Sequence, residues 1–318
     1  MLKVLGKISL NDISVCYSNI LNRHEDIMQD QVDVITAQDL GCKLVKYIEE
    51  RYKASNSISG VKSGFPTIDA MTHGFQKGNL ITVCSNLSYY KNCFVMQLLQ
   101  RIVIIDKVPC GFISYTTNYQ QFGLSLISRD SLVSVSKIVA GMLNEQESRD
   151  IQKSCSSIFD SHVVIPRVCA SSFDELCNII RESVKKHDLR IIFIDSLNTI
   201  PIEKEAGSYK TRLANIIKKL KMLAVELDIS IVTDYYSYEN VKEILLDEID
   251  KSEILEQNTD FLYPYSDVVL QLQKLSGKKG DDFYLFELGI FCGEYRLSRY
   301  KSLQFDPEVE EFQEEENN

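Results

Sequence analysis

The feature that most constrains this fold is a series of continuous apolar strands separated by amphipathic helices. The strand patterns include Leu80–Cys84, Gly111–Thr116, Arg190–Asp195 and Ile229–Thr233, and a long helical pattern covers Leu213–Leu227. A strand that is apolar at every position, rather than at every second one, is buried on both faces. The sequence therefore predicts an α/β fold in which a mostly parallel sheet is flanked by helices.

After Ser266 the pattern changes. Asp267–Leu272, Phe283–Phe286 and Tyr295–Tyr300 read as consecutive strands with glycine-containing turns between them. Strands joined by tight turns pair antiparallel. We therefore expect an antiparallel extension at one edge of the sheet.

The flanks differ from the body of the chain. Residues 1–33 show weak periodicity and are expected to form an N-terminal tail. Residues 34–59 are predicted to form a linker helix and the loop that follows it, because apolar residues recur there at helical spacing, at Ala37, Leu40, Leu44 and Ile48. The apolar side of this helix requires a cover, which either its own domain or a neighbouring subunit could provide. Residues 60–305 form the main predicted domain, and residues 306–318 are expected to be an acidic disordered tail.

The net charge of residues 1–305 argues against a general nucleic-acid-binding surface. The formal net charge is −10, and the seven acidic residues of 306–318 leave −3 for the rest. Such a body does not present the strongly basic surface that is typical of nucleic-acid binding, although a local basic lining could exist inside an oligomer. Candidate phosphate contacts are Lys218–Lys221, and Lys274, Lys278 and Lys279 around a turn, with a solvated surface as the alternative.

Targeting signals and metal motifs are absent from the sequence. No apolar run approaches the roughly 18–20 residues that cross a bilayer, and the N-terminus does not resemble a secretory signal. None of the nine cysteines forms a C-x-x-C pair. We therefore expect a cytoplasmic protein with reduced thiols, no zinc and no membrane partner.

Two loops at the carboxyl ends of predicted strands indicate a nucleotide site. Against the phosphate-loop pattern G-x-x-x-x-G-K-[ST], the segment after Val83 keeps Lys91, places Ser85 and Tyr90 at the glycine positions, and has Asn92 instead of the hydroxyl residue. Asp195 ends a later strand, where a carboxylate can hold Mg²⁺ or, alternatively, cap a turn. The nucleotide-binding candidates are therefore Ser85, Ser88, Tyr90, Lys91, Asn92 and Asp195, the last also a metal ligand if ATP/Mg²⁺ binds, and we expect that binding to be weak or absent.

Several longer segments share one resemblance. Gly64–Leu80 (GFPTIDAMTHGFQKGNL), Ser136–Glu147, Phe173–Ile200 and Leu213–Val232 occur in the same order as similar segments of the motor domain of DnaB-type replicative helicases. The resemblance covers roughly residues 60–306 and implies a RecA-like P-loop NTPase fold. It also implies ATP-driven DNA unwinding by a ring, commonly a hexamer, in which the 34–52 helix holds the linker-helix position.

Departures from that family argue for an eroded site. By resemblance, Thr116 stands at the position of the catalytic glutamate, and threonine cannot act as a general base. The family's polar glutamine is replaced near Asp234–Tyr235. The segment Glu287–Gly293, where the family carries a basic finger, has no Lys or Arg, and Arg296 is the nearest candidate.

Three functions follow from these observations. The leading hypothesis is a helicase-like, non-hydrolysing binding or assembly module associated with DNA replication, whose candidate partners are further copies of the chain, DNA or replication proteins. The alternative is a divergent ATP-dependent helicase or ATPase, favoured by the retained Lys91 and Asp195 and by Asp234 as a candidate replacement for the missing acid. The second alternative is a nucleic-acid-binding structural protein that uses the lysines named above.

Overall fold

The computed structural model describes residues 36–53, 58–168, 172–201, 208–237, 259–275, 283–293, 297–307 and 309–315. The chain divides into two compact units, Met1–Ser59 and Gly60–Asn318. In the first unit, α2 spans Ala37–Lys53, and the Thr36 hydroxyl accepts a hydrogen bond from the Asp39 amide at its start. Leu40, Leu44 and Ile48 of α2 are exposed.

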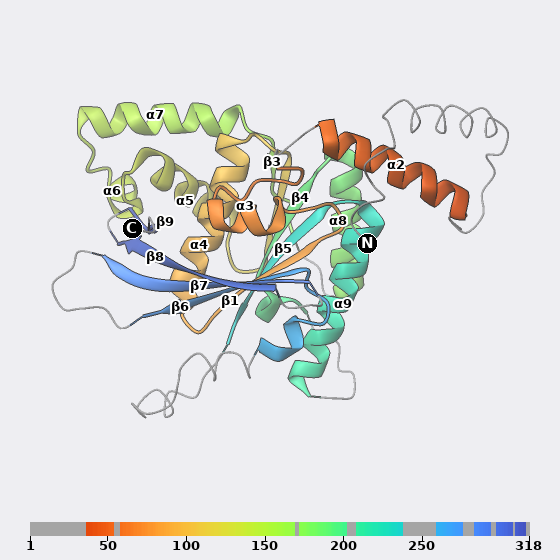
Figure 1. Ribbon diagram of the computed structural model, residues 1–318. Coiled ribbons are helices and arrows are strands. Elements are labelled where there is room, and N and C mark those ends of the chain that lie inside the picture. The colour runs from red at the N-terminus through yellow and green to blue at the C-terminus, as the bar shows by residue number, and fades with distance from the viewer. Residues whose placement is uncertain are drawn as a thin grey trace, which may run out of the picture. The chain divides into compact units, whose positions relative to one another are not determined.

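A single mixed sheet organises the second unit, in the order β3-β2-β4-β5-β1-β6-β7-β8-β9 for the described residues. Pairing is parallel from β3 to β6 and antiparallel from β6 to β9. This arrangement confirms the predicted α/β fold with its antiparallel edge extension (Figure 1). The strands are β1 (Leu80–Ser85), β2 (Cys110–Ser114), β3 (Val163–Val164), β4 (Ile191–Asp195), β5 (Ser230–Tyr236), β6 (Val268–Lys274), β7 (Tyr284–Cys292), β8 (Leu297–Asp306) and β9 (Glu311–Glu314).

Helices cover both faces of the sheet, as its apolar strands require. On β4, Ile191 and Phe193 join the core under α3, α4 and α5, whereas Ile192 and Ile194 join the core under α8 and α9. The helices are α3 (Pro66–Thr72), α4 (Ser88–Gln100), α5 (Tyr119–Ser131), α6 (Val135–Ala140), α7 (Glu145–Phe159), α8 (Phe173–His187) and α9 (Tyr209–Leu227), with a π-helical turn at Arg101–Ile105 and 3₁₀ turns at Leu197–Thr199 and Asp260–Leu262. Among the described helices, none is both long and apolar enough to cross a bilayer.

Of the boundaries that differ from the sequence prediction, two concern the candidate site. The helix after β1 was expected from about Lys91 but begins at Ser88, so Lys91 lies within α4. The strand expected to end at Thr233 continues to Tyr236, which places Asp234 in β5 rather than in a loop. In each case tertiary pairing and packing extend the element beyond its apolar run.

The prediction of a disordered 306–318 tail is wrong for Glu311–Glu314. These residues form β9, which pairs with β8, and Phe312 is completely buried against Phe94, Phe286 and Phe305. The Gln97 side chain exchanges hydrogen bonds with the Phe312 backbone at 2.9 and 2.8 Å. One aromatic residue within an acidic run therefore anchors the segment along α4.

Replacing Phe312 with alanine tests this anchor. Because Phe312→Ala removes a fully buried ring, we expect the free energy of unfolding to fall by about 3–5 kcal/mol in chemical denaturation. Phe159→Ala is the matched control, since that ring is 89% exposed and its loss should change stability by less than about 0.5 kcal/mol. Equal effects of the two substitutions would show that β9 is not packed on the domain.

Candidate functional site

The candidate nucleotide loop is shorter in the structure than its sequence pattern suggests. β1 ends at Ser85 and α4 begins at Ser88, which leaves only Asn86 and Leu87 between strand and helix. The two residues aligned with glycines therefore lie in regular elements, Ser85 in β1 and Tyr90 in α4. A glycine-rich loop binds phosphate by wrapping its backbone N–H groups around it, and this short connection offers little backbone for that purpose.

The two serines near this connection, Ser85 and Ser88, lie in different environments. The Ser85 side chain is buried and accepts a hydrogen bond from the Leu87 amide at 3.1 Å, which closes the turn before α4. Ser88 is exposed in the first turn of α4, and Asn92 is exposed one turn further on. The helix begins without a side-chain cap at Leu87.

Tyr90 packs into an aromatic cluster instead of approaching the end of β1. Its ring centroid lies 4.8 Å from that of Phe286 and 5.0 Å from that of Phe305. The Lys274 ammonium lies 5.2 Å from the Tyr90 centroid and 3.8 Å from the Tyr284 centroid. The structure thus brings together a predicted nucleotide residue and a predicted DNA contact, and their mutual contact is a cation–π arrangement.

Lys91 forms a buried ion pair with Asp234. The Lys91 ammonium bonds to the Asp234 carboxylate, and each side chain is only 2% exposed. α4 supplies the lysine directly after β1, and β5 supplies the aspartate opposite Val83 of β1 in the parallel register. From the sequence, Asp234 is a candidate replacement for the family's polar glutamine and for its missing acid. Its pairing with Lys91 depends on the β1–β5 register, which no local pattern reveals.

Burial governs the protonation of Asp234. Removal from water raises the pKa of Asp234 from 3.8 to about 6, the nearby Lys91 opposes that rise, and the neighbouring Asp195 adds to it. The same burial raises the pKa of the Cys84 thiol on β1 to about 12, with Lys91 acting in the opposite direction. The charge of Lys91 is therefore compensated within the protein.

Asp195 lies at the carboxyl end of β4, where the sequence placed it. Its carboxylate accepts hydrogen bonds from the Ser114 hydroxyl at 2.8 Å and the Thr117 hydroxyl at 3.2 Å. Ser114 pairs directly with Asp195 between β2 and β4. Thr116 follows β2 and is exposed, with its hydroxyl 3.4 Å from that of Ser114. The described part of the chain contains no group of three or more His, Cys, Asp or Glu side chains suited to a metal ion.

The remaining basic candidates have intramolecular contacts or lie outside the described residues. Lys221 of the Lys218–Lys221 run pairs with Asp267 at 2.7 Å, and Lys219 lies 5.5 Å from the Phe173 ring centroid. Lys278, Lys279 and Arg296 lie outside the described residues.

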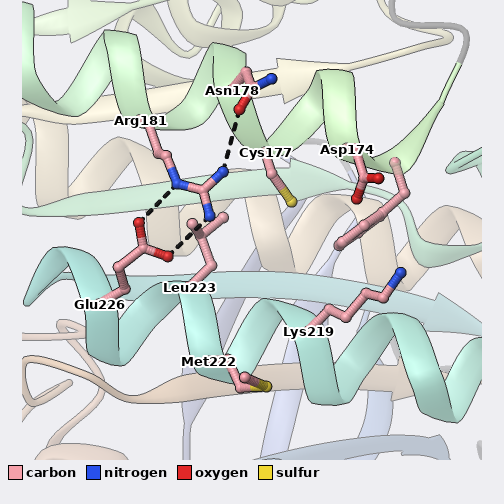
Figure 2. Close-up of a pocket in the computed structure, with 9 residues that line it drawn as sticks. Asp174, Cys177, Asn178, Arg181, Lys219, Met222, Leu223 and Glu226 are labelled. Atoms are coloured by element: carbon pink, nitrogen blue, oxygen red, sulfur yellow. Dashed lines mark hydrogen bonds and ion pairs between the residues drawn. The ribbon is translucent and has the colours of Figure 1, made fainter. Parts of the chain in front are cut away.

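A groove between α8 and α9 lies under the opposite face of the sheet from Lys91. It has a volume of 360 Å³ and is crossed by a two-bond contact between the Arg181 guanidinium and the Glu226 carboxylate, at 2.7 and 2.9 Å (Figure 2). Arg181 also donates to the Asn178 side chain at 3.2 Å. The Arg181 guanidinium of this groove is thus paired with a carboxylate of the protein. No pattern in the sequence predicts the groove.

Comparisons with known proteins agree with this architecture. Residues 60–263 match the family model described as DnaB-like helicase C terminal domain. The chain belongs to this family.

Relatives are similar over part of their length. The chain is 29% identical over 189 residues to a "Replicative DNA helicase DnaB" of Treponema pallidum, covering 59% of this chain and 43% of that protein. It is 25% identical over 276 residues to a "Probable replicative DNA helicase" of Trieres chinensis, covering 81% and 58%. The chain therefore spans about half the length of the curated relatives that it matches.

Solved structures share the fold. One of them, an isolated ATPase domain, superposes with a TM-score of 0.75 at 21% identity, covering 87% of this chain and 99% of that one. A second, of a DnaB-like replicative helicase studied with its interactions with primase, gives a TM-score of 0.72 at 20% identity, covering 95% and 74%. At this identity the likeness establishes the RecA-like helicase fold.

A double-mutant cycle tests whether Lys91 and Asp234 stabilise each other. At pH 8, Lys91→Met should lower the free energy of unfolding by about 3–5 kcal/mol, because it leaves the Asp234 carboxylate buried without a cation. Adding Asp234→Leu to that variant should restore most of the loss, since an apolar pair of similar size leaves no buried charge. Losses that simply add in the double variant would mean that the two side chains do not interact.

The pH dependence of stability gives a second test of the pair. Because the folded-state pKa of Asp234 is raised from 3.8 to about 6, protonation favours the folded state. The contribution of this group is therefore full below about pH 4 and is lost as the pH rises through 6. We compare the free energy of unfolding of the wild type with that of Lys91→Met/Asp234→Leu. The difference, wild type minus variant, should fall by roughly 1–3 kcal/mol between pH 4 and 6.5. A flat or rising difference would contradict the buried carboxylate.

Proposed function

We propose that this chain is a helicase-like domain that serves DNA replication as a non-hydrolysing binding or assembly module. One observation carries the proposal: the lysine at the phosphate position is buried in an ion pair with Asp234. A phosphate group would have to compete with that carboxylate for the Lys91 ammonium. Membership of the DnaB-like family supports the association with replication.

Other residues of the site also fit Mg²⁺ and ATP poorly. The connection between β1 and α4 is two residues long, and Asn92 offers an exposed amide where the motif has a hydroxyl. Thr116 has no carboxylate with which to accept a proton from water. Loss of a single charge-stabilising group in phosphoryl transfer can reduce the rate by about 10³–10⁵. Several such losses together favour a domain that does not turn over ATP.

A divergent ATPase remains the second candidate because Asp195 is well placed. It lies at the carboxyl end of a central parallel strand and is oriented by the Ser114 and Thr117 hydroxyls. Ligands of open α/β sheets bind at such strand ends. In this candidate Asp195 would hold Mg²⁺ and Lys91 would leave Asp234 for the nucleotide. Direct nucleic-acid binding receives less support, because Lys274 and Lys221 have partners within the domain.

We further propose that the module assembles with copies of itself, as the family resemblance to hexameric helicases suggests. Leu44, Ile48 and Leu40 place an exposed apolar stripe on α2, and such a stripe favours burial against another surface. Further partners on this proposal are DNA or replication proteins, since one structural relative was studied with its interactions with primase.

The rate of ATP hydrolysis, followed as phosphate release, tests whether the domain is non-hydrolysing. The wild type with millimolar ATP and Mg²⁺ should release phosphate no faster than Lys91→Met/Asp234→Leu, in which both groups of the pair are replaced without leaving a buried charge. The melting temperature of the wild type should not rise with ATP. Turnover that requires Mg²⁺ and is lost in the double variant would reject the proposal and establish the divergent ATPase.

Light scattering of the purified chain tests assembly. We expect a mass above that of the monomer, and a reduced mass for Leu44→Glu/Ile48→Glu, because carboxylates replace the exposed apolar stripe of α2. Lys43→Glu/Lys46→Glu alters the charge of the same helix without changing the stripe and should retain the wild-type mass. A monomeric wild type at high micromolar concentration would contradict the assembly role.

A further inference from the structure

Asp234 is a carboxylate buried inside the sheet. It lies inside β5 at 1% residue exposure, where an ionised carboxylate is costly without a partner. The charged and polar groups that face it are the Lys91 ammonium from α4, the Asp195 carboxylate from β4 and the Ser196 hydroxyl. Cys84 of β1 lies near the same lysine and is held as a neutral thiol by burial.

We propose that Asp234 is a resident anion that occupies the phosphate-binding ammonium of Lys91 and thereby sets the site's specificity against polyphosphates. This inference rests on the proposed function and deepens it, because it assigns the loss of nucleotide binding to one residue. The pair is complete within the fold: α4 and β5 supply opposite charges, and each side chain is 2% exposed.

Competition for a single cation explains why Asp234 would exclude a phosphate. If a phosphate took the Lys91 ammonium, the Asp234 carboxylate would remain buried beside Asp195, a like charge. Because one partner of a buried pair would then be uncompensated, the affinity of the domain for the phosphate is expected to be lower by on the order of 10²–10³-fold. Asp195 cannot relieve this, because it carries the same charge as Asp234.

Neutralising Asp234 should therefore create affinity of the domain for a polyphosphate. Asn has nearly the same shape as Asp and no charge, so Asp234→Asn leaves the Lys91 ammonium without the carboxylate that it bonds in the wild type. A polyphosphate can then supply the missing charge, provided that the end of β1 and the start of α4 admit it. The gain must depend on Lys91, since that ammonium is the group released.

The experiment is calorimetric titration of the full chain with inorganic tripolyphosphate at pH 7.5. Asp234→Asn should bind at least about 30-fold more tightly than the wild type, a bound set conservatively below the competition estimate. Asp234→Asn/Lys91→Ala should lose that gain. The matched control is Asp228→Asn, which neutralises an exposed carboxylate paired with Lys77 at 2.5 Å and should leave affinity at the wild-type level. A folded Asp234→Asn protein with wild-type affinity would overturn the inference.

A second measurement applies if Asp234→Asn does not fold. Lowering the pH from 7.5 to 5.5 protonates part of Asp234, whose pKa is raised to about 6, and so frees Lys91 in the wild type. Tripolyphosphate affinity of the wild type should then rise by more than that of Lys91→Met/Asp234→Leu, which corrects for protonation of the ligand and of other groups. An equal change in both proteins would overturn the inference.

These outcomes separate the inference from the proposed function. Rapid ATP hydrolysis by the wild type would reject the non-hydrolysing module. An at least about 30-fold gain in tripolyphosphate affinity for Asp234→Asn would still support Asp234 as a competitor for Lys91, and no gain would reject both. An inactive wild type together with an unresponsive Asp234→Asn protein would keep the module and reject Asp234 as its cause.

Discussion

The ion pair between Lys91 and Asp234 is the interaction on which the end of the sheet depends. It joins the helix that follows β1 to the strand beside β1, and both side chains lie almost wholly out of water. Each charge makes the burial of the other tolerable, so we expect removal of Lys91 alone to cost more stability than replacement of both residues. In this account, the lysine that the sequence predicts for a nucleotide phosphate makes a structural contact with Asp234 instead.

The surroundings of the pair fit that interpretation. A two-residue connection lets α4 begin early, and Tyr90 then packs with Phe286 and Phe305 rather than near the end of β1. β9 lies along α4, where Phe312 and the Gln97 side chain hold it. Helix α4 is therefore fixed by aromatic packing on one side and by a buried charge pair on the other, which suits a rigid scaffold better than a loop that opens around a ligand.

Much of the fold could be predicted from the sequence because its signals are local. Continuous apolar strands such as Ile191–Asp195 need cover on both faces, and consecutive strands after Ser266 require antiparallel pairing. The site was harder, because its geometry arises from register between distant segments. Lys91 and Asp195 are predicted from their places after strands, but the partner of Lys91 depends on β1 lying beside β5. The acidic composition of 306–318 hid Phe312, whose burial becomes visible only once β8 offers an edge.

The account is tested most directly by a crystal structure of the wild-type chain grown with Mg²⁺ and a millimolar non-hydrolysable ATP analogue. We predict that the Lys91 ammonium remains on the Asp234 carboxylate and that no nucleotide is seen at the end of β1. Density for phosphates bonded to Lys91, with Asp234 displaced or bonded elsewhere, would contradict the account and make this domain a nucleotide-binding member of its family.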